Sequence, residues 1–314
     1  MPRSLVLGAA GFLGSNLSAE LLKRGHDVIG LDNFATSTDQ NLIELLANPG
    51  FQFIRATVSD TKDWPEFEKL DFIYHLASPA SPPKYQKLGL ETLKANTIGT
   101  ENLMNLSIKH NARFLFASTS EIYGDPAVTP QSEGYWGNVN TIGPRSVYDE
   151  AKRLGETLVS LFNREYGLDG AIIRIFNTYG PGMDPYDGRV VSSFIRQALN
   201  SEPFSVFGDG SQTRSFCFVD DLIDGIISMA ESGEPGPINL GNPNEIDLLT
   251  LGEAVAKVLG VEAEYSFEEL PEDDPKQRRP DITLAKALLK WEPKVPLSEG
   301  IQRTAAWIKS SRSS

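Results

Sequence analysis

The 314-residue chain has little cysteine, histidine and positive charge, and each shortage excludes a class of protein. Its one cysteine, Cys217, permits no internal disulfide, suits a reducing compartment and is expected to be packed in the core. The three histidines, His26, His75 and His110, are scattered without the spacing of metal ligands, so we expect no metal. Lysine and arginine total 29 against 42 acidic residues, and the net charge of −13 disfavours nucleic acid and anionic membrane surfaces as partners.

Long hydrophobic runs are also lacking. No apolar stretch approaches the roughly 20 residues of a membrane helix, and the apolar strand expected from Ser4 leaves no room for a signal peptide. We therefore expect a cytoplasmic protein. Hydrophobic residues still make up 40% of the chain, enough for a large core.

Apolar runs alternate with helical patterns through the first 180 residues. The runs that predict strands are Ser4–Gly8, His26–Asp32, Phe51–Ala56, Asp71–Ala77, Arg113–Ser118 and Gly170–Phe176. Long helical patterns cover Leu88–His110 and Ser146–Tyr166. This alternation is typical of an α/β protein with a Rossmann-type, doubly wound parallel sheet, so residues 1–180 are predicted to form an NAD-binding domain. Shorter elements follow, and residues 181–314 are predicted to form a smaller C-terminal substrate-binding lobe, with part of about 215–241 returning to the sheet.

A glycine-rich segment lies between the first predicted strand and the first helical pattern. It reads Gly8-Ala9-Ala10-Gly11-Phe12-Leu13-Gly14, and glycines there let the backbone approach a pyrophosphate at a helix N-terminus. Asp32 ends the second strand, where a carboxylate can bind an adenosine ribose and repel a 2′-phosphate, which favours NAD over NADP. The alternative is an ordinary tight turn, but loop, helix and acid agree in register. Further cofactor contacts are expected, by position, from Asn33, Asp60, Leu76, Ala77 and Ser78.

Tyr148 and Lys152 lie four residues apart in a helical pattern and so project from one face. A tyrosine hydroxyl is a weak base because its pKa is about 10. A nearby ammonium and the positive charge of oxidised nicotinamide both favour the phenolate. The alternative is a chance pair on a helix surface, but its place downstream of a dinucleotide loop favours catalysis and also a role in cofactor binding.

A second polar group, Thr119, Ser120 and Glu121, follows a later strand at its carboxyl end. Ligands bind beyond those ends in doubly wound sheets. A hydroxyl beside a carboxylate can orient a substrate hydroxyl and handle a second proton. A helix cap explains one hydroxyl but leaves Glu121 unexplained.

Together these motifs resemble the extended short-chain dehydrogenase/reductase superfamily over nearly the whole chain. Within it, six long segments resemble UDP-glucuronic acid decarboxylases, also called UDP-xylose synthases. These segments are His75–Tyr85, Pro130–Asn138, Gly143–Glu150, Asp187–Ser192, Gly208–Phe216 and Asp273–Asp281.

The resemblance implies decarboxylation of UDP-glucuronate to UDP-xylose through a UDP-4-keto intermediate, with tightly bound NAD. It places Tyr148 as base at C4, Thr119 on the C4 oxygen and Glu121 near C5. It places Arg278 near the departing carboxylate, which suits a planar guanidinium. The remaining substrate contacts that it implies are Tyr85, Lys94, Asn177, Arg189 and Arg214. It also implies a homodimer.

The sequence leaves two questions open: the effect of one departure from the family pattern, and which 4-keto reaction the protein catalyses. The family usually has arginine where this chain has Gly182, which could alter binding or product partition. Other 4-keto enzymes share the tyrosine, lysine and glycines: a 4,6-dehydratase, a 4-epimerase, or a decarboxylase that releases a UDP-4-keto-pentose. Ser120, where dehydratases normally have aspartate, and Arg278 favour decarboxylation, while release or reduction of the 4-keto intermediate stays open. A non-catalytic dinucleotide sensor is disfavoured because such proteins usually lose the Tyr–Lys pair.

Overall fold

The computed structural model describes residues 1–269 and 277–311, and its centre is a parallel seven-stranded sheet of order β11-β6-β5-β4-β1-β2-β3. Its strands are β1 (Arg3–Leu7), β2 (Asp27–Asp32), β3 (Phe51–Arg55), β4 (Phe72–His75), β5 (Arg113–Thr119), β6 (Gly170–Ile175) and β11 (Ile238–Leu240). The chain runs outward from β1 to β3, then crosses to β4 and continues outward on the other side. The carboxyl ends of β1 and β4 therefore flank the switch point at which such folds bind ligands. The predicted doubly wound sheet is confirmed.

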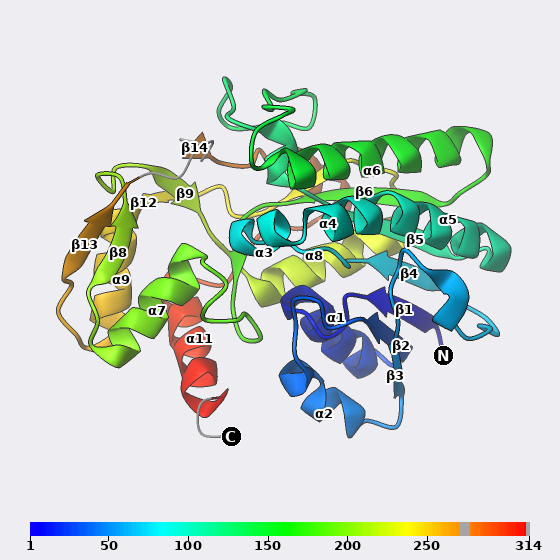
Figure 1. Ribbon diagram of the computed structural model, residues 1–314, viewed down its shortest axis with the longest axis horizontal. Helices are drawn as coiled ribbons and strands as arrows, with labels where there is room; N and C mark the ends of the chain where they lie inside the picture. The colour runs from blue at the N-terminus through cyan, green and yellow to red at the C-terminus, as the bar shows by residue number, and fades with distance from the viewer. Residues whose placement is uncertain (270–276, 312–314) are drawn as a thin grey trace.

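Helices cover both faces of this sheet (Figure 1). One face carries α1 (Phe12–Lys23) and α8 (Val219–Ser232), which contact each other. The other carries α4 (Gly89–Asn96), α5 (Ile98–His110) and α6 (Ser146–Glu165). The strands are buried on both sides and so read as continuous apolar runs, as in β5, where all seven residues are buried. Short segments complete this body: η1 (Asp39–Leu42), α2 (Ile43–Leu46), η2 (Thr61–Asp63), α3 (Pro82–Lys87) and η3 (Ser120–Tyr123).

The single helix predicted over Leu88–His110 is wrong, because the structure divides it at Thr97. Thr97 has φ −116° and ψ −80°, which departs from helical geometry. Four side chains around the break bond to carbonyls four residues earlier, an arrangement that bends helices. They are Thr92, Asn96, Thr97 and Thr100.

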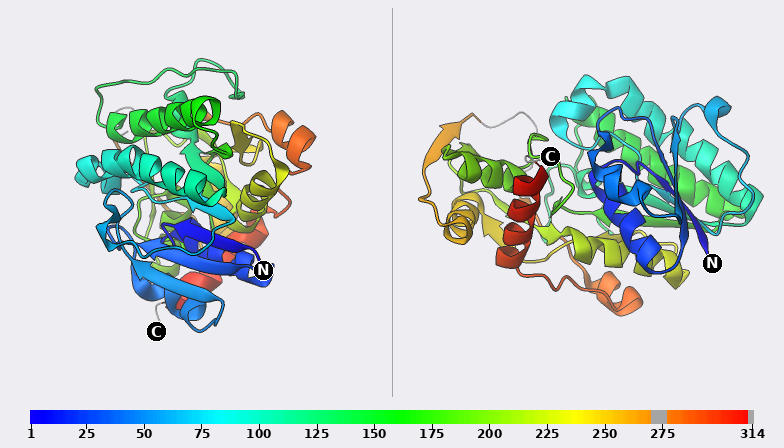
Figure 2. Two further views of the ribbon diagram at one scale, coloured as in Figure 1. Left: turned by 90° about the vertical axis from the view of Figure 1, so that its right-hand side faces the viewer. Right: turned by 90° about the horizontal axis from the view of Figure 1, so that it is seen from below.

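A smaller lobe lies beside this body, at the left of Figure 1 and again at the left of the right-hand view in Figure 2. It contains α7 (Val190–Asn200), β8 (Phe204–Phe207), β9 (Thr213–Ser215), β12 (Glu245–Asp247), α9 (Leu248–Leu259), β13 (Tyr265–Glu268), β14 (Gln277–Arg278) and α11 (Leu297–Ser311). Strand β9 lies between β12 and β14, and β8 pairs with β13. Residues 273–276, the start of the Asp273–Asp281 segment, lie outside the described residues.

The chain crosses repeatedly between the lobe and the sheet. β7 (Thr178–Tyr179) pairs with β10 (Cys217–Phe218), and α8 and β11 then return to the large sheet, followed later by α10 (Thr283–Leu289). Cys217 is fully buried in the core, as predicted, and burial raises the pKa of its thiol.

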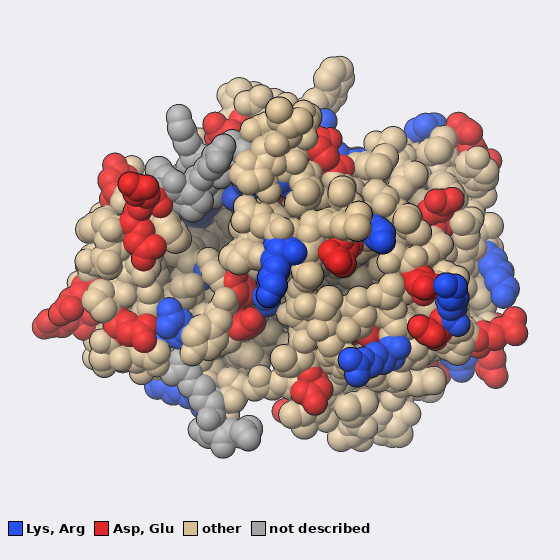
Figure 3. Space-filling model, in the orientation of Figure 1, with Lys and Arg blue, Asp and Glu red and all other residues tan. Residues whose placement is uncertain are grey.

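Figure 3 shows the surface hollowed between the lobe and the body, with acidic side chains gathered on the outer side of the lobe.

No helix within residues 1–269 and 277–311 is both long and apolar enough to cross a membrane. No group of three or more His, Cys, Asp or Glu side chains there could hold a metal ion.

Candidate active site

The glycine-rich turn between β1 and α1 has a backbone that only glycine allows. Gly8 has φ +82°, and a Cβ there would lie 3.1 Å from the backbone of Ala77. A Cβ on Gly14 would lie 2.0 Å from the carbonyl oxygen of Gly8. Gly11, the N-cap of α1, has no side chain over the exposed amides of the first turn, where Phe12 and Leu13 follow. The turn is thus an open backbone cradle at a helix N-terminus, which fits the pyrophosphate of NAD.

Asp32, at the end of β2, is bonded directly to this cradle. Its Oδ2 accepts from the amide of Ala10 at 3.1 Å, and its Oδ1 accepts from Phe34 N at 2.8 Å and from Ser37 Oγ at 3.1 Å. Asp32 therefore does organise the turn that follows β2, as the alternative interpretation supposed. The same bonds fix its carboxylate beside the glycine turn, where a ribose would lie.

The other residues expected along the cofactor follow the strand ends. Asn33 follows Asp32 and donates to Thr57 Oγ1 at 2.6 Å. Asp60 caps η2 after β3 and has a half-exposed side chain. Leu76, Ala77 and Ser78 follow β4, where Ser78 Oγ accepts from Asn96 Nδ2 at 2.8 Å.

Tyr148 and Lys152 occupy one face of α6, and both are buried, at 6% and 3% exposure. Lys152 Nζ donates to the carbonyl of Ala117 at 2.7 Å and lies 5.7 Å from the centre of the Tyr148 ring. Thr119, at the end of β5, shares a side-chain hydrogen bond with Tyr148. The helix and the strand end thus bring three predicted residues together.

Burial controls the protonation of this pair. It raises the pKa of Tyr148 to about 12, although the bond with Thr119 acts in the opposite direction. Burial also lowers the pKa of Lys152 to about 7, opposed by the charge of Glu156. The sequence predicts that the Lys152 ammonium and oxidised nicotinamide together favour the phenolate, and in the protein by itself burial favours the neutral hydroxyl of Tyr148. Positive charge from oxidised nicotinamide is needed to favour the phenolate.

Tyr85 of α3 lies against the catalytic tyrosine. The two rings are stacked, with centroids 5.0 Å apart and an interplanar angle of 4°. The hydroxyl of Tyr85 is buried and has no hydrogen-bond partner among the described residues. A buried hydroxyl without a partner is unfavourable, so it is suited to accept a ligand group.

Glu121 of η3 is the centre of the charged part of the site. Arg278 of β14 binds both of its oxygens, Nη1 to Oε1 at 2.7 Å and Nη2 to Oε2 at 2.9 Å, and Arg145 Nη2 lies 2.8 Å from Oε2. Burial raises the pKa of Glu121, but the charges of Arg278 and Arg145 outweigh it and hold that pKa below its usual value. The carboxylate is therefore ionised, and Ser120 is buried beside it.

The predicted substrate residues are only partly brought together. Arg214 is buried on β9 beside Arg278 in the β9–β14 register, and Asn177 Oδ1 lies 3.4 Å from Arg278 Nη1. Arg189 caps α7, donates to the carbonyl of Ala80 at 3.2 Å and lowers the pKa of Tyr148. Lys94 is exposed in the last turn of α4.

Although the net charge of the chain is negative, positive side chains predominate around Glu121. The buried guanidinium groups of Arg145, Arg214 and Arg278 come from three distant segments and converge on Glu121. Such convergence suits a ligand that carries a diphosphate and a carboxylate.

Two residues of the site were missed from the sequence. Arg145 was not assigned a role, although it stands four residues before Asp149 and thus on the same face of the helix start. Asp149 is 5% exposed and its Oδ1 has no partner among the described residues. Burial and the nearby charge of Glu121 raise the pKa of Asp149 to about 8. In the sequence, both residues stood out only as members of the segment Gly143–Glu150, which resembles the decarboxylases. No local pattern indicates their roles, because their partners lie on other elements.

Gly182, where the family usually has arginine, follows β7. It has φ +89°, and a Cβ there would lie 3.0 Å from Asn16 Nδ2. Its carbonyl accepts from Asn41 Nδ2 at 3.0 Å. The local backbone therefore favours glycine, and a side chain would have to displace the neighbouring asparagine.

Comparison with known proteins agrees with this geometry. Residues 4–241 match the NAD dependent epimerase/dehydratase family. The chain is 49% identical over 301 residues to UDP-glucuronic acid decarboxylase 1 of Arabidopsis thaliana, covering 96% of this chain and 68% of the plant protein.

Two solved structures are similar over almost their full length. UDP-glucose 4-epimerase of Thermotoga maritima, solved with UDP-glucose, has a TM-score of 0.89 at 30% identity and 99% coverage of both chains. UDP-glucuronic acid 4-epimerase of Bacillus cereus, solved with UDP-glucuronic acid and NAD, has a TM-score of 0.86 at 30% identity, covering 98% of this chain and 99% of that one. Identity is thus much higher to the decarboxylase than to either epimerase. The chain belongs to the NAD dependent epimerase/dehydratase family and, within it, to the UDP-glucuronic acid decarboxylases.

Proposed function

We propose that the protein converts UDP-glucuronate to UDP-xylose by oxidation at C4, loss of carbon dioxide and re-reduction, with NAD retained between turnovers. The observation that carries this proposal is the meeting of two groups at the carboxyl end of β5. Tyr148, Lys152 and Thr119 form a proton-transfer group, and Glu121 with Arg278 forms a carboxylate-handling group. The 49% identity to a UDP-glucuronic acid decarboxylase supports the same reaction.

In the first step, Tyr148 accepts the proton of the C4 hydroxyl while Thr119 orients the C4 oxygen. NAD, held by the Gly8–Gly14 turn and Asp32, supplies the hydride acceptor when bound. The bond from Lys152 Nζ to the carbonyl of Ala117 fixes its amino group 5.7 Å from the centre of the tyrosine ring, where its protonated form adds positive charge. This arrangement stabilises the phenolate only while positive charge is present.

Oxidation at C4 places the C5 carboxylate β to a ketone, so its loss as carbon dioxide leaves a stabilised enolate. Arg278 recognises the carboxylate, and its attachment to Glu121 limits how strongly it can hold the ground state. The enolate then takes one proton at C5 from a water molecule that the ionised carboxylate of Glu121 orients, and solvent replaces that proton. Tyr148 returns its proton to the C4 oxygen as C4 is reduced again, so over a complete cycle one proton replaces one carbon dioxide. Arg189, Arg214, Asn177, Tyr85 and Lys94 are the proposed contacts to the rest of the UDP-sugar.

The test is the reaction of UDP-glucuronate in D₂O, followed by proton and carbon NMR. We expect UDP-xylose with one deuteron at C5 and only protium at C4, because the same hydride returns to C4. Deuterium at C4 would contradict retention of the hydride. Formation of the C4 epimer with its carboxylate intact would contradict decarboxylation and favour an epimerase like the Bacillus cereus neighbour.

We further propose that the protein is a homodimer that pairs through the face formed by α4, α5 and α6. Exposed apolar side chains on these helices support this: Leu90, Leu93, Ile98 and Leu154, at 37–60% exposure. These helices lie side by side in Figure 1. Light scattering of the purified protein should give twice the 34.5 kDa mass of the chain, and Leu154→Glu should shift the measured mass toward that of the monomer.

The cytoplasmic location remains a prediction supported by the single cysteine.

A further inference from the structure

A buried polar network lies behind the site, and its hub is Asn239 of β11, which is fully buried. Its side-chain oxygen accepts from the hydroxyl of Tyr123 at 2.8 Å. Its Nδ2 donates to two carbonyls, those of Gln131 and Asp281, each at 3.0 Å. Its backbone amide donates to Glu133 Oε1 at 2.9 Å. Both donors and the acceptor of the side-chain amide are therefore used, each on a different part of the chain.

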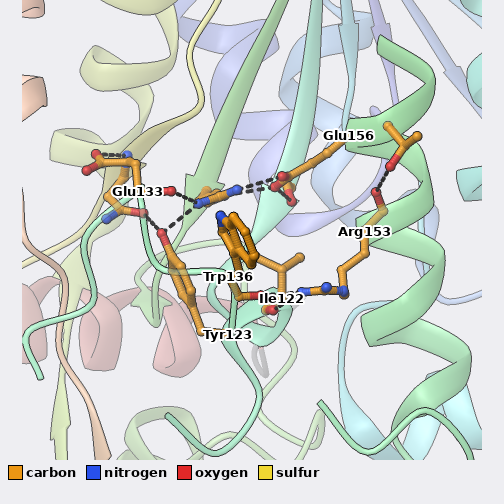
Figure 4. Close-up of polar contacts among 10 residues, drawn as sticks. Ile122, Tyr123, Glu133, Trp136, Arg153 and Glu156 are labelled. Atoms are coloured by element: carbon orange, nitrogen blue, oxygen red, sulfur yellow. Dashed lines mark hydrogen bonds and ion pairs between the residues drawn. The ribbon is translucent and has the colours of Figure 1, made fainter. Parts of the chain in front are cut away.

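Tyr123 connects this hub to the catalytic helix (Figure 4). It ends η3, two residues after Glu121, and its hydroxyl accepts from Arg174 Nη1 at 2.9 Å. Arg174 lies on β6 and donates to both oxygens of Glu156, at 3.0 Å and 2.8 Å. Glu156 stands four residues after Lys152 on α6 and also accepts from Ser118 Oγ at 2.6 Å. The chain of bonds thus joins α6, the end of β5 and η3.

Gln131 connects the same hub to the segment that carries Arg278. The backbone amide of Gln131 donates to the carbonyl of Arg279, and its side-chain Oε1 accepts from the backbone amide of Arg279, both at 2.8 Å. Its carbonyl accepts from the amide of Asp281 at 2.8 Å. The residues on both sides of Pro280, Arg279 and Asp281, are therefore fixed to a loop that Asn239 also holds.

The hydrogen bonds of this network explain how Glu121 and Arg278 are held in position relative to each other. Glu121 and Arg278 are 157 residues apart and sit on η3 and β14, two short elements that do not pair with each other. Short elements have few internal bonds with which to fix their own position. β14 pairs with β9. Both short elements are in addition attached to Asn239, η3 through Tyr123 and β14 through Gln131, and Arg174 attaches this network to α6, the helix that carries Tyr148.

We propose that Tyr123, Asn239 and Arg174 are positioning residues that set Glu121 and Arg278 relative to Tyr148, and so control the steps after C4 oxidation. The inference rests on the proposed function, because it assigns these residues to particular steps of that reaction. Oxidation depends on Tyr148, Lys152 and Thr119, which lie on the long elements α6 and β5 and not on η3 or β14. Decarboxylation and re-reduction depend in addition on the alignment of η3 and β14.

The test is Tyr123→Phe, which removes one buried oxygen and keeps the ring that packs against Tyr135 and Phe176. The matched control is Tyr135→Phe in the same loop, which removes a hydroxyl that accepts only from the amide of Ala127 among the described residues. Rates are measured per NAD-loaded site, so that partial unfolding changes the amount of active protein and not the rate. NADH absorbance in a single turnover reports oxidation, and NMR reports the products.

For Tyr123→Phe we expect oxidation within threefold of the wild type, kcat for UDP-xylose at least tenfold lower, KM within threefold, and NADH with UDP-4-keto-pentose accumulating. Arg174→Lys keeps the buried charge but cannot bond Tyr123 and Glu133 together with Glu156, and it should shift the products in the same direction. Tyr135→Phe should match the wild type within twofold.

Three results would overturn the inference: an unchanged kcat and product ratio in Tyr123→Phe, equal slowing of oxidation and later steps, or the same effect in Tyr135→Phe. Equal slowing would indicate a general structural role. A wild-type protein that makes no UDP-xylose would instead overturn the proposed function, so the two failures are distinguishable.

Discussion

Arg278 binds both carboxylate oxygens of Glu121, at 2.7 Å and 2.9 Å. The guanidinium that is proposed to recognise the substrate carboxylate is therefore already oriented by an internal carboxylate. Because Arg145 binds the same glutamate at 2.8 Å, Glu121 stays ionised and paired if the substrate draws Arg278 away. The site can thus exchange one carboxylate partner for another without leaving a buried charge alone.

The paired bonds of Arg278 lead to a first prediction. Lysine keeps the charge but cannot bind two oxygens in a fork, so Arg278→Lys should lose about 1.5–3 kcal/mol, or roughly 10- to 100-fold in kcat. Arg279→Lys is the matched control, because Arg279 bonds the carbonyl of Pro243 and lies 3.8 Å from Glu245, away from Glu121. Steady-state rates of carbon dioxide release measure both, and equal losses in the two variants would contradict the assigned role.

A second prediction concerns Tyr148. Replacing it with phenylalanine removes the proton acceptor and should lower kcat by about 10²- to 10⁴-fold. Binding of UDP-glucuronate should change little, because the ring and its stacking on Tyr85 remain. Calorimetric titration gives the binding constant, and NMR gives the rate. A variant that retains a tenth or more of wild-type turnover would exclude Tyr148 as the base.

A third prediction concerns the cofactor turn. A methyl group on Gly14 would lie 2.0 Å from the carbonyl oxygen of Gly8, so Gly14→Ala must distort the turn. We expect a loss of about 1–3 kcal/mol in stability and loss of co-purifying NAD, measured by denaturation and by absorbance of the released cofactor. Gly25→Ala is the control: it also has a positive φ, +82°, but a Cβ there meets nothing within 4 Å. It should cost about 1 kcal/mol and keep its NAD.

A fourth prediction follows from the buried carboxyl of Asp149. Its pKa is about 8 in the folded protein against about 4 when unfolded. The unfolded chain therefore releases this proton first, and the contribution of Asp149 to stability falls as the pH rises from about 4 to about 8. The stability of Asp149→Asn relative to the wild type should rise over this range by at most about 1.4 kcal/mol per pH unit.

Urea denaturation at pH 5, 6.5 and 8 measures this difference. Glu150→Gln, which changes the neighbouring carboxylate with a side chain 37% exposed, is the matched control. A difference between Asp149→Asn and the wild type that does not grow with pH would show that Asp149 titrates normally.

The sequence predicted the parts of the protein that depend on local patterns. The strands, the glycine turn and the Tyr148–Lys152 pair follow from periodicity and from spacing within one helix, and the structure confirms the strands and the helix that carries the pair. The break at Thr97 escaped prediction because side-chain bonds to the backbone, and not a loss of apolar periodicity, end α4.

Contacts between distant segments could not be predicted in this way. The Arg174–Tyr123 bond spans 51 residues and the Tyr123–Asn239 bond spans 116, and no local pattern encodes either. One signal was present: Arg174 is a single charge in the apolar run Gly170–Phe176, and a buried charge requires a partner. The identity of that partner, Glu156, came only from the fold.

The most direct test of the central claim is proton NMR of UDP-glucuronate with the purified protein and a trace of NAD, with absorbance at 340 nm recorded in parallel. The account predicts UDP-xylose in amounts far above the NAD present, with no lasting NADH signal. Release of UDP-4-keto-pentose with one NADH per product, or a spectrum that shows only the C4 epimer or unchanged substrate, would contradict it.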